Sequence, residues 1–310
     1  MATTIPTAAH SSRTLRLGHS PDPDDAFMWY PLANFPNGTG PGGGTFKPRI
    51  DTRGYEFIHV LEDIQSLNDR SLRGELEITA ISIHQYPYVA DKYALTNCGS
   101  SMGDNYGPMV VAPRAGKLQL EDLTSPKITI AVPGTRTTAF LALSLLLGKD
   151  TFRYQVVPFD QIIARVVAGE FDAGLIIHEG QLTYANAGLR KLVDLGQWWT
   201  STHGLPLPLG GNAIRRDLPG GHDEMRRICT VLLDSIRYAL DHRDEAVRYA
   251  LAYARDMGTE LADKFVGMYV NQWTLDYGDI GRRAVNQLLA EAARAHITPD
   301  IGTVDFVHPM

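Results

Sequence analysis

The feature that most constrains the fold is a regular alternation of short apolar strands and helices in the middle of the chain. Strands are predicted at 128–132, 154–157 and 173–177, separated by helices at 137–147 and 162–167. Alternation at this spacing is typical of βαβ units, in which helices connect parallel strands and cover the sheet. We therefore expect an α/β fold with a mostly parallel sheet.

The flanking parts of the chain add further elements to this pattern. The N-terminal part predicts strands at 15–19, 55–61, 78–83 and 109–112, and helices at 26–32 and 62–72. The last third predicts helices only, at 225–240, 244–257, 260–269 and 279–296. In the first of these helices, one apolar stripe is formed by Met225, Ile228, Leu232, Ile236 and Ala239. We expect this helical part to pack on a sheet.

Length and charge restrict the domain organisation and the partners. A chain of 310 residues exceeds the size at which one hydrophobic core keeps growing, so two domains are expected. The formal charge is −6, and the 29 basic and 35 acidic residues are spread along the chain. Nucleic acid and anionic membranes attract basic surfaces, so neither is expected as a partner. A small-molecule ligand is the expected partner.

The cysteines and the N-terminus bear on the cellular compartment. Cys98 and Cys229 are far apart in the sequence, which indicates neither a disulfide framework nor a CxxC metal site, although one long-range bridge stays open. The first fourteen residues are polar and lack the apolar core of a secretory signal. No run approaches the roughly 20 apolar residues that cross a bilayer. The expected location is cytoplasmic.

One candidate binding segment is the strand, turn and helix start at 128–140. Ligands of open α/β sheets bind beyond the carboxyl ends of the strands. Thr137 and Thr138 are expected at the helix N-terminus, where free backbone N–H groups and the helix dipole bind carboxylates. Simple N-capping by a threonine is the alternative. Because Gly134 and Arg136 come together with the two threonines, we favour ligand binding.

A second candidate is His178, which follows the apolar run that ends at Ile177. A histidine at the end of a strand is well placed to act as a base, because its pKa lies near neutrality. From the residues alone, an ordinary core or surface histidine is at least as common. A zinc motif does not follow, because HExxH needs a second histidine where this chain has Leu182.

The acidic loop at Ser20 to Asp25 and the glycine-rich segment at 36–44 complete the candidates. Three carboxylates in the first loop could bind a metal, but no flanking ligands with EF-hand spacing follow, so we favour helix capping by Asp25. The glycine-rich segment predicts an exposed loop without chemistry, because no phosphate-binding spacing accompanies its glycines.

Several short segments, taken together and in order, resemble the 1,4-dihydroxy-6-naphthoate synthase family over about residues 15 to 295. They are the Ser-Pro-x-Pro-x-Asp loop at Ser20 to Asp25, Leu-Glu-Asp-Ile-x-x-Leu-Asn at 61–68, Val-Pro-Gly with Thr-Thr-Ala at 132–139, Gly-Leu-Ile-Ile-His-Glu at 174–179 and Leu-Pro-Leu-Pro-Leu-Gly at 205–210. This resemblance implies a two-lobed fold of the class II periplasmic-binding-protein type. One lobe would comprise 1–111 and 208–310, and the other 112–207.

The resemblance also implies an activity, the cleavage of cyclic de-hypoxanthine futalosine to 1,4-dihydroxy-6-naphthoate and dihydroxyacetone in menaquinone biosynthesis. His178 falls on the family's proton-accepting histidine. Proton removal can start such a carbon–carbon cleavage without a metal or redox cofactor, so no cofactor is expected. The substrate-binding residues that we predict are Ser20, Asn68, Ala80, Ile81, Ser82, Arg136, Thr137 and Thr138. A homodimer is one expectation for the assembly.

The sequence departs from the family at the acidic loop and at one position of the binding stretch. Typical members have Cys, Asn and Thr where this chain has Asp22, Asp24 and Ala26, and Lys where it has Ala80. These changes would weaken the hold on an anionic substrate unless Arg136 or His84 supplies a positive charge.

Two rival functions share the same fold. A solute-binding protein without catalysis would carry a signal peptide or a lipid anchor. The chorismate dehydratase of the same pathway is less favoured, because the Ile-Ile-His-Glu segment fits the naphthoate synthase.

Overall fold

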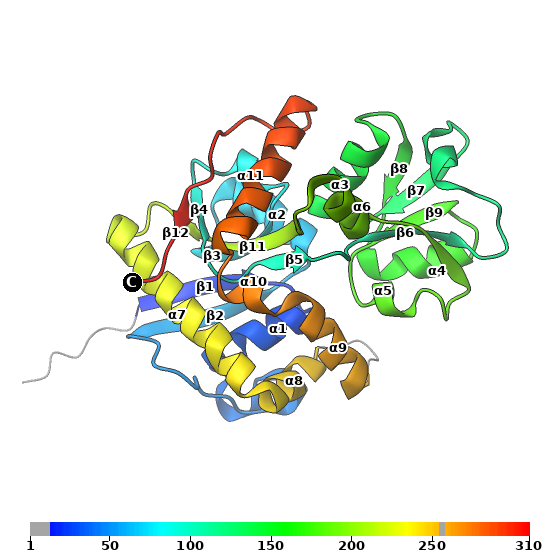
Figure 1. The fold of residues 1–310 in the computed structure, drawn as a ribbon. Coiled ribbons are helices and arrows are strands. Elements are labelled where there is room, and N and C mark those ends of the chain that lie inside the picture. The colour runs from blue at the N-terminus through cyan, green and yellow to red at the C-terminus, as the bar shows by residue number, and fades with distance from the viewer. Residues whose placement is uncertain (1–12, 254–257) are drawn as a thin grey trace, which may run out of the picture.

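The computed structural model describes residues 13–253 and 258–310, which form two lobes, each built around its own sheet (Figure 1). In these residues the larger lobe has a seven-stranded sheet in the order β12-β4-β11-β3-β1-β2, with β5 paired to β11. Its strands are β1 (Arg13–His19), β2 (Tyr55–Leu61), β3 (Ile78–Ser82), β4 (Tyr93–Thr96), β5 (Ser101–Gly103), β11 (Leu207–Arg215) and β12 (Phe306–Val307). The N-terminal and C-terminal parts of the chain thus share one sheet.

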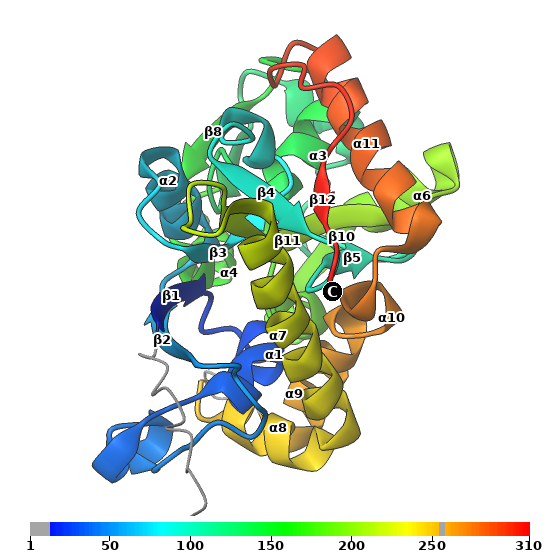
Figure 2. The ribbon, with the colours of Figure 1, turned by 90° about the vertical axis from the view of Figure 1, so that its left-hand side faces the viewer.

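Helices cover both faces of this large sheet (Figures 1 and 2). They are α1 (Pro23–Trp29), α2 (Ile64–Arg73), α7 (Gly221–Asp241), α8 (Arg243–Leu251), α9 (Thr259–Tyr269), α10 (Gln272–Leu275) and α11 (Gly278–Arg294). Neighbouring strand residues face opposite sides, so Ile214 of β11 joins the core with α7, whereas Ala213 joins the core with α11. The apolar stripe predicted for α7 is buried along its whole length, which confirms it.

The smaller lobe contains the predicted βαβ stretch. Among the described residues its sheet has five strands in the order β10-β6-β9-β7-β8. The strands are β6 (Met109–Pro113), β7 (Thr129–Val132), β8 (Arg153–Val156), β9 (Ala173–Ile176) and β10 (Leu189–Asp194), and the helices are α3 (Thr138–Leu147), α4 (Ile162–Val167), α5 (Gly180–Thr183) and α6 (Leu195–His203). As the alternation predicts, β7 runs parallel to β8 and to β9.

The expectation of mostly parallel sheets is only partly met. In the larger lobe β11 runs antiparallel to β3, β4 and β5, and in the smaller lobe β6 runs antiparallel to β9 and β10. Both strands adjoin the segments in which the chain passes from one lobe to the other, so they enter their sheets in the reverse direction. Because β6 already pairs with β9 at Met109, the chain enters the smaller lobe a little before the expected boundary at residue 111. The division into domains stays a prediction.

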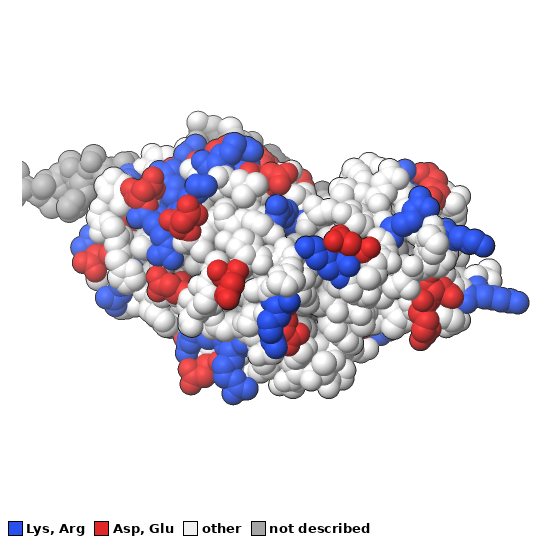
Figure 3. All heavy atoms as spheres, turned by 90° about the horizontal axis from the view of Figure 1, so that it is seen from above, with Lys and Arg blue, Asp and Glu red and all other residues white. Residues whose placement is uncertain are grey.

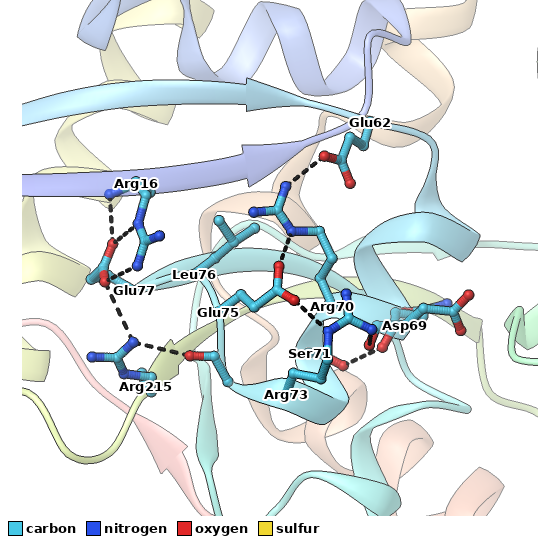
Figure 4. Close-up of polar contacts among 12 residues, drawn as sticks. Arg16, Glu62, Asp69, Arg70, Ser71, Arg73, Glu75, Leu76, Glu77 and Arg215 are labelled. Atoms are coloured by element: carbon cyan, nitrogen blue, oxygen red, sulfur yellow. Dashed lines mark hydrogen bonds and ion pairs between the residues drawn. The ribbon is translucent and has the colours of Figure 1, made fainter.

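Two groups of ion pairs lie near the start of β3: one joins β1 to β11 through Glu77, and the other surrounds Arg70 and Arg73 of α2 (Figure 4). The Glu77 carboxylate accepts two hydrogen bonds from the Arg16 guanidinium, at 2.7 and 2.8 Å, and one from Arg215 at 3.4 Å. A neighbouring group joins Arg70 of α2 to Glu62 and Glu75. Elsewhere on the surface, the face in Figure 3 shows basic and acidic side chains interspersed over both lobes.

The glycine-rich segment and the helix predicted at 244–257 can also be compared with the structure. The glycine-rich segment at 36–44 lies largely at the surface and contains two short 3₁₀ turns, at Pro36–Gly38 and Pro41–Gly43. Of the helix predicted at 244–257, α8 covers the first part, and residues 254–257 lie outside the described residues. In the part of the chain that the structure describes, no helix is both long enough and apolar enough to pass through a bilayer.

Candidate functional site

A cavity of about 130 Å³ lies between the two lobes. Six of the predicted site residues line it: Ser20, Ala80, Ile81, Ser82, Thr137 and Thr138. The strand ends bring them together, because β1 and β3 of the larger lobe end opposite the turn that follows β7 of the smaller lobe. The structure thus gathers residues from segments more than 100 positions apart, and their roles in binding stay a prediction.

The threonine pair stands at the N-terminus of α3 and contacts both lobes. Thr137 is the N-cap, and its Oγ1 accepts a hydrogen bond of 3.2 Å from the Phe140 N–H. The Thr138 hydroxyl donates to the Leu209 carbonyl oxygen at 2.5 Å and accepts from the His84 N–H at 3.2 Å. Since both hydroxyls are used within the protein, a ligand at this wall would meet chiefly the free N–H groups of the first helical turn.

Asn68 and Arg136 lie behind the cavity wall. The buried Asn68 amide donates to Ser82 Oγ at 2.9 Å and to the Arg136 carbonyl oxygen at 3.3 Å, while its oxygen accepts from the Ser82 N–H at 3.0 Å. The Arg136 guanidinium lies over the Tyr88 ring, 3.8 Å from its centroid. Neither side chain lines the cavity, so Asn68 orients Ser82, and Arg136 helps to hold the lobes together.

His84, the other candidate for a positive charge, is buried and uncharged near neutral pH. Burial lowers the pKa of His84 to about 4, with a further contribution from the Arg136 charge and an opposing one from its hydrogen bond to the Thr137 carbonyl oxygen. That bond joins Nδ1 to the oxygen at 3.1 Å. Neither Arg136 nor His84 therefore places a positive charge on the cavity wall.

His178 directly follows the lining residue Ile177 but does not itself line the cavity. The side chain is buried, with Nε2 3.0 Å from the Phe159 carbonyl oxygen and Nδ1 accepting from the Gly180 N–H at 3.0 Å. Burial lowers the pKa of His178, but the adjacent Glu179 and the charge of Asp22 on the other lobe outweigh it, so the pKa lies above the usual 6.5. The ring is within electrostatic reach of the cavity, yet both nitrogens are engaged by the backbone.

The acidic segment forms one wall of the cavity, with Asp22 at the N-cap position of α1 and Asp24 and Asp25 in its first turn. Asp22, Asp24 and Asp25 all line it, and Asp25 accepts a hydrogen bond of 2.8 Å from the Ser20 N–H, which folds the loop back on itself. Helix α1 begins at Pro23 after Asp22, whose side chain makes no capping bond, so the interpretation of Asp25 as a helix cap was wrong. Within residues 13–253 and 258–310 no group of three or more His, Cys, Asp or Glu side chains is arranged to hold a metal ion.

Burial changes the protonation of these carboxylates. It raises the pKa of Asp24 well above the usual 3.8, and the charges of Asp25 and Asp22 add to this effect. It raises the pKa of Asp25 to about 7, although the Ser20 N–H opposes the change. Close to neutral pH this wall therefore carries less than its full formal charge.

Sequence reasoning missed several residues of the cavity, above all Asn212 of β11 and Tyr269 of α9. Asn212 stands opposite Ala80 in the antiparallel pairing of β11 with β3. The Tyr269 hydroxyl donates to Gln181 Oε1 of the smaller lobe at 2.9 Å. A polar residue after Gly210-Gly211 in a buried strand was a usable signal for Asn212. Nothing local distinguishes Tyr269 from a core residue of its helix.

Comparison with known proteins bears on this two-lobed site. A family model described as menaquinone biosynthesis matches residues 15–294. The chain belongs to the menaquinone-biosynthesis family. Two relatives carry the name 1,4-dihydroxy-6-naphtoate synthase. The one from Thermus thermophilus is 41% identical over 90% of this chain and 93% of its own length. The one from Streptomyces coelicolor is 36% identical over 94% and 97%.

Solved structures show which fold this member of the menaquinone-biosynthesis family adopts. Protein AF1704 from Archaeoglobus fulgidus aligns with a TM-score of 0.79 at 40% identity, over 94% of this chain and 99% of its own. The alkanesulfonate-binding protein SsuA from Xanthomonas axonopodis pv. citri, bound to MOPS, aligns with a TM-score of 0.67 at 12% identity, over 96% and 98%. The expected periplasmic-binding-protein-like fold is confirmed.

Proposed function

We propose that this chain converts cyclic de-hypoxanthine futalosine to 1,4-dihydroxy-6-naphthoate and dihydroxyacetone, as a carbon–carbon lyase of menaquinone biosynthesis. The names of the two relatives support the product, 1,4-dihydroxy-6-naphthoate. The observation that carries the proposal is that His178 directly follows Ile177, a residue of the cavity lining, and that the charge of Asp22, another lining residue, helps to raise its pKa. A cytoplasmic location and a small-molecule substrate go with this reaction, and a homodimer stays a prediction.

The reaction needs one base and no external oxidant. His178 accepts a proton from a substrate hydroxyl, and the electron pair of the broken O–H bond forms a carbonyl group while the adjacent carbon–carbon bond breaks. The electron pair of the broken carbon–carbon bond goes to the ring-bearing fragment, which receives the proton back and becomes aromatic. Closure of the lobes excludes water from the intermediate. For His178 to act, its Nδ1 has to exchange the Gly180 N–H for the substrate hydroxyl.

The test is an assay of the purified chain with cyclic de-hypoxanthine futalosine, followed by chromatographic detection of the naphthoate. We expect His178→Asn to lower turnover at least about 100-fold, as is typical for loss of a general base. The control is His222→Asn, which changes an exposed histidine on α7. Wild-type protein that is folded but forms no naphthoate would refute the reaction, and unchanged turnover by His178→Asn would refute the role of the histidine.

Ligand binding without turnover is the second candidate, and one observation favours it. Both nitrogens of His178 are occupied by backbone partners in this conformation, and the ring does not line the cavity. The two functions separate in the same assay, because a binding protein would take up the substrate stoichiometrically and release it unchanged.

A further inference from the structure

The larger lobe presents an acceptor wall to the cavity, which we define as Asp24, Asp25 and Asn212. All three side chains line the cavity. Amide oxygens accept hydrogen bonds, and a carboxyl group keeps an acceptor oxygen even when burial leaves it protonated, so a ligand facing this wall has to bring donors. Among the lining residues, all of which the structure describes, there is no Lys or Arg to neutralise the wall.

Asn212 is the member that points most directly to a missing ligand. It is 1% exposed, and its Nδ2 donates to the Gly99 carbonyl oxygen at 2.8 Å, while Oδ1 is buried without a hydrogen-bond partner. Rotating the side-chain amide by 180° would place Oδ1 against the Gly99 carbonyl oxygen, and two acceptors cannot form a hydrogen bond. The hydrogen bond to Gly99 therefore identifies Oδ1 as the atom without a partner. Buried acceptors are almost always satisfied, and leaving one unpaired costs free energy.

The backbone around Asn212 is shaped to hold this amide in place. Gly99 has φ +77, and a Cβ there would come within 2.5 Å of Asn212 Nδ2. The Asn212 carbonyl oxygen in turn accepts from the Thr96 hydroxyl at 2.9 Å. The unpaired oxygen therefore belongs to a rigid strand, as expected of a preorganised binding group.

The opposite wall has the complementary polarity. It is formed by Thr137, Thr138 and Ala139 at the start of α3, where free backbone N–H groups suit an anionic or acceptor group. A ligand is therefore oriented with its acceptor end at α3 and its donor end at the acceptor wall. Neutral hydroxyls suit that wall better than an ammonium group, because burial leaves Asp24 and Asp25 with less than full charge.

We propose that the acceptor wall is the subsite for the hydroxyl-bearing part of the ligand. Where the ligand is the substrate of the proposed function, on which this assignment then rests, that part is the three-carbon unit released as dihydroxyacetone. This orientation also brings the reacting hydroxyls to the side of the cavity where Asp22 influences His178. The acidic loop thus determines which end of the substrate meets the base.

The test measures affinities by calorimetry in a His178→Asn background, where turnover does not interfere. The two ligands are cyclic de-hypoxanthine futalosine and an analogue whose sugar-derived hydroxyls are replaced by hydrogen. We expect Asn212→Leu and Asp24→Ala, each of which removes an acceptor, to weaken binding of the hydroxylated ligand about 10-fold or more, and to change binding of the analogue less than about twofold. The control is Asn34→Ala, at an exposed position outside the cavity.

Equal losses for both ligands, or no loss, would overturn the assignment, and Asp24→Ala keeps the test decisive if Asn212→Leu does not fold. If the parent binds neither ligand, the proposed function fails, and the subsite is then judged with dihydroxyacetone alone. Saturation-transfer NMR of the wild-type chain would show dihydroxyacetone binding that Asp24→Ala abolishes if the assignment holds. Absence of binding, or binding unchanged by the substitution, would overturn it.

Discussion

The Tyr269 hydroxyl of α9 donates a 2.9 Å hydrogen bond to Gln181 Oε1 of α5, so a buried bond joins the two lobes beside the cavity. Tyr269 also lines the cavity, and Gln181 Nε2 has no partner. The bond therefore exists only while the lobes are together. It is one of the contacts that set the balance between open and closed forms.

Tyr269→Phe should shift the chain toward the open form. The change leaves the whole buried Gln181 amide unpaired, which costs the closed form about 1–3 kcal/mol. We expect a larger radius of gyration in small-angle scattering and a weaker affinity for ligands that bind between the lobes. Tyr238→Phe is the control, since that ring stacks on His242 at the surface of α7. Scattering and affinity equal to those of the wild type would show that the bond does not contribute to closure.

Asp22→Asn should move the pH dependence of turnover. The base has to be unprotonated, so kcat/KM rises as the pH increases through the pKa of His178, which lies above the usual value. Removing the Asp22 charge lowers this pKa, so the rise should occur at lower pH, and Glu179→Gln should move it further. The measurement is a pH–rate profile, with the exposed Asp91→Asn as control. A profile that stays in place in both variants would exclude His178 as the titrating base.

Glu77→Gln should lower the free energy of unfolding at neutral pH and weaken its dependence on pH in the acid range. Burial opposes ionisation of Glu77, but the hydrogen bonds and charge of Arg16 outweigh it and lower its pKa to about 2 (Figure 4). A lowered pKa contributes stability that is present above the unfolded value of about 4.5 and is lost as the pH falls toward 2. We expect a loss of about 1–2 kcal/mol at pH 7, reduced by solvent screening at Arg16, and none at the acid end. Denaturant unfolding at several pH values measures this.

Glu75→Gln provides the comparison for that experiment. Its carboxylate pairs with Arg70 and Arg73 at the surface, where water screens ion pairs, so the effect should be smaller. An equal or larger loss for this variant would mean that the buried position of Glu77 does not matter.

Cys98 and Cys229 should be unreactive in the folded chain. Both are buried free thiols whose Sγ atoms lie 3.9 Å apart. The hydrogen bond between the two thiols, together with burial, raises the pKa of the Cys98 thiol. A raised pKa disfavours the reactive thiolate. We expect negligible reaction with Ellman's reagent in the native state and reaction of both thiols in guanidinium. Rapid native-state labelling, or a disulfide formed on mild oxidation, would contradict this.

The local pattern of the sequence determined the elements that carry their own signal. β2 and α4 occupy the predicted residues, and the N-cap at Thr137 follows from its position before an apolar helix. Periodicity and capping depend on neighbours within a few positions, so they can be read directly. The ordered motifs likewise predicted the family and the two-lobed fold.

Contacts between distant segments decided the rest. The pairing of strands such as β5 and β10, and the antiparallel direction of β6 and β11, depend on where the chain passes between the lobes. Tertiary packing also turned Arg136 onto Tyr88, set Asn68 behind Ser82 and brought Cys98 to Cys229.

The cavity shows the same division most clearly. The sequence identified Thr137 and the residues of β3, but the unpaired oxygen of Asn212 and the bond from Tyr269 to Gln181 became visible only in three dimensions. Hydrogen-bond satisfaction and burial are properties of atoms that meet in space. A linear pattern predicts which residues are able to meet, and only the folded chain decides which of them do.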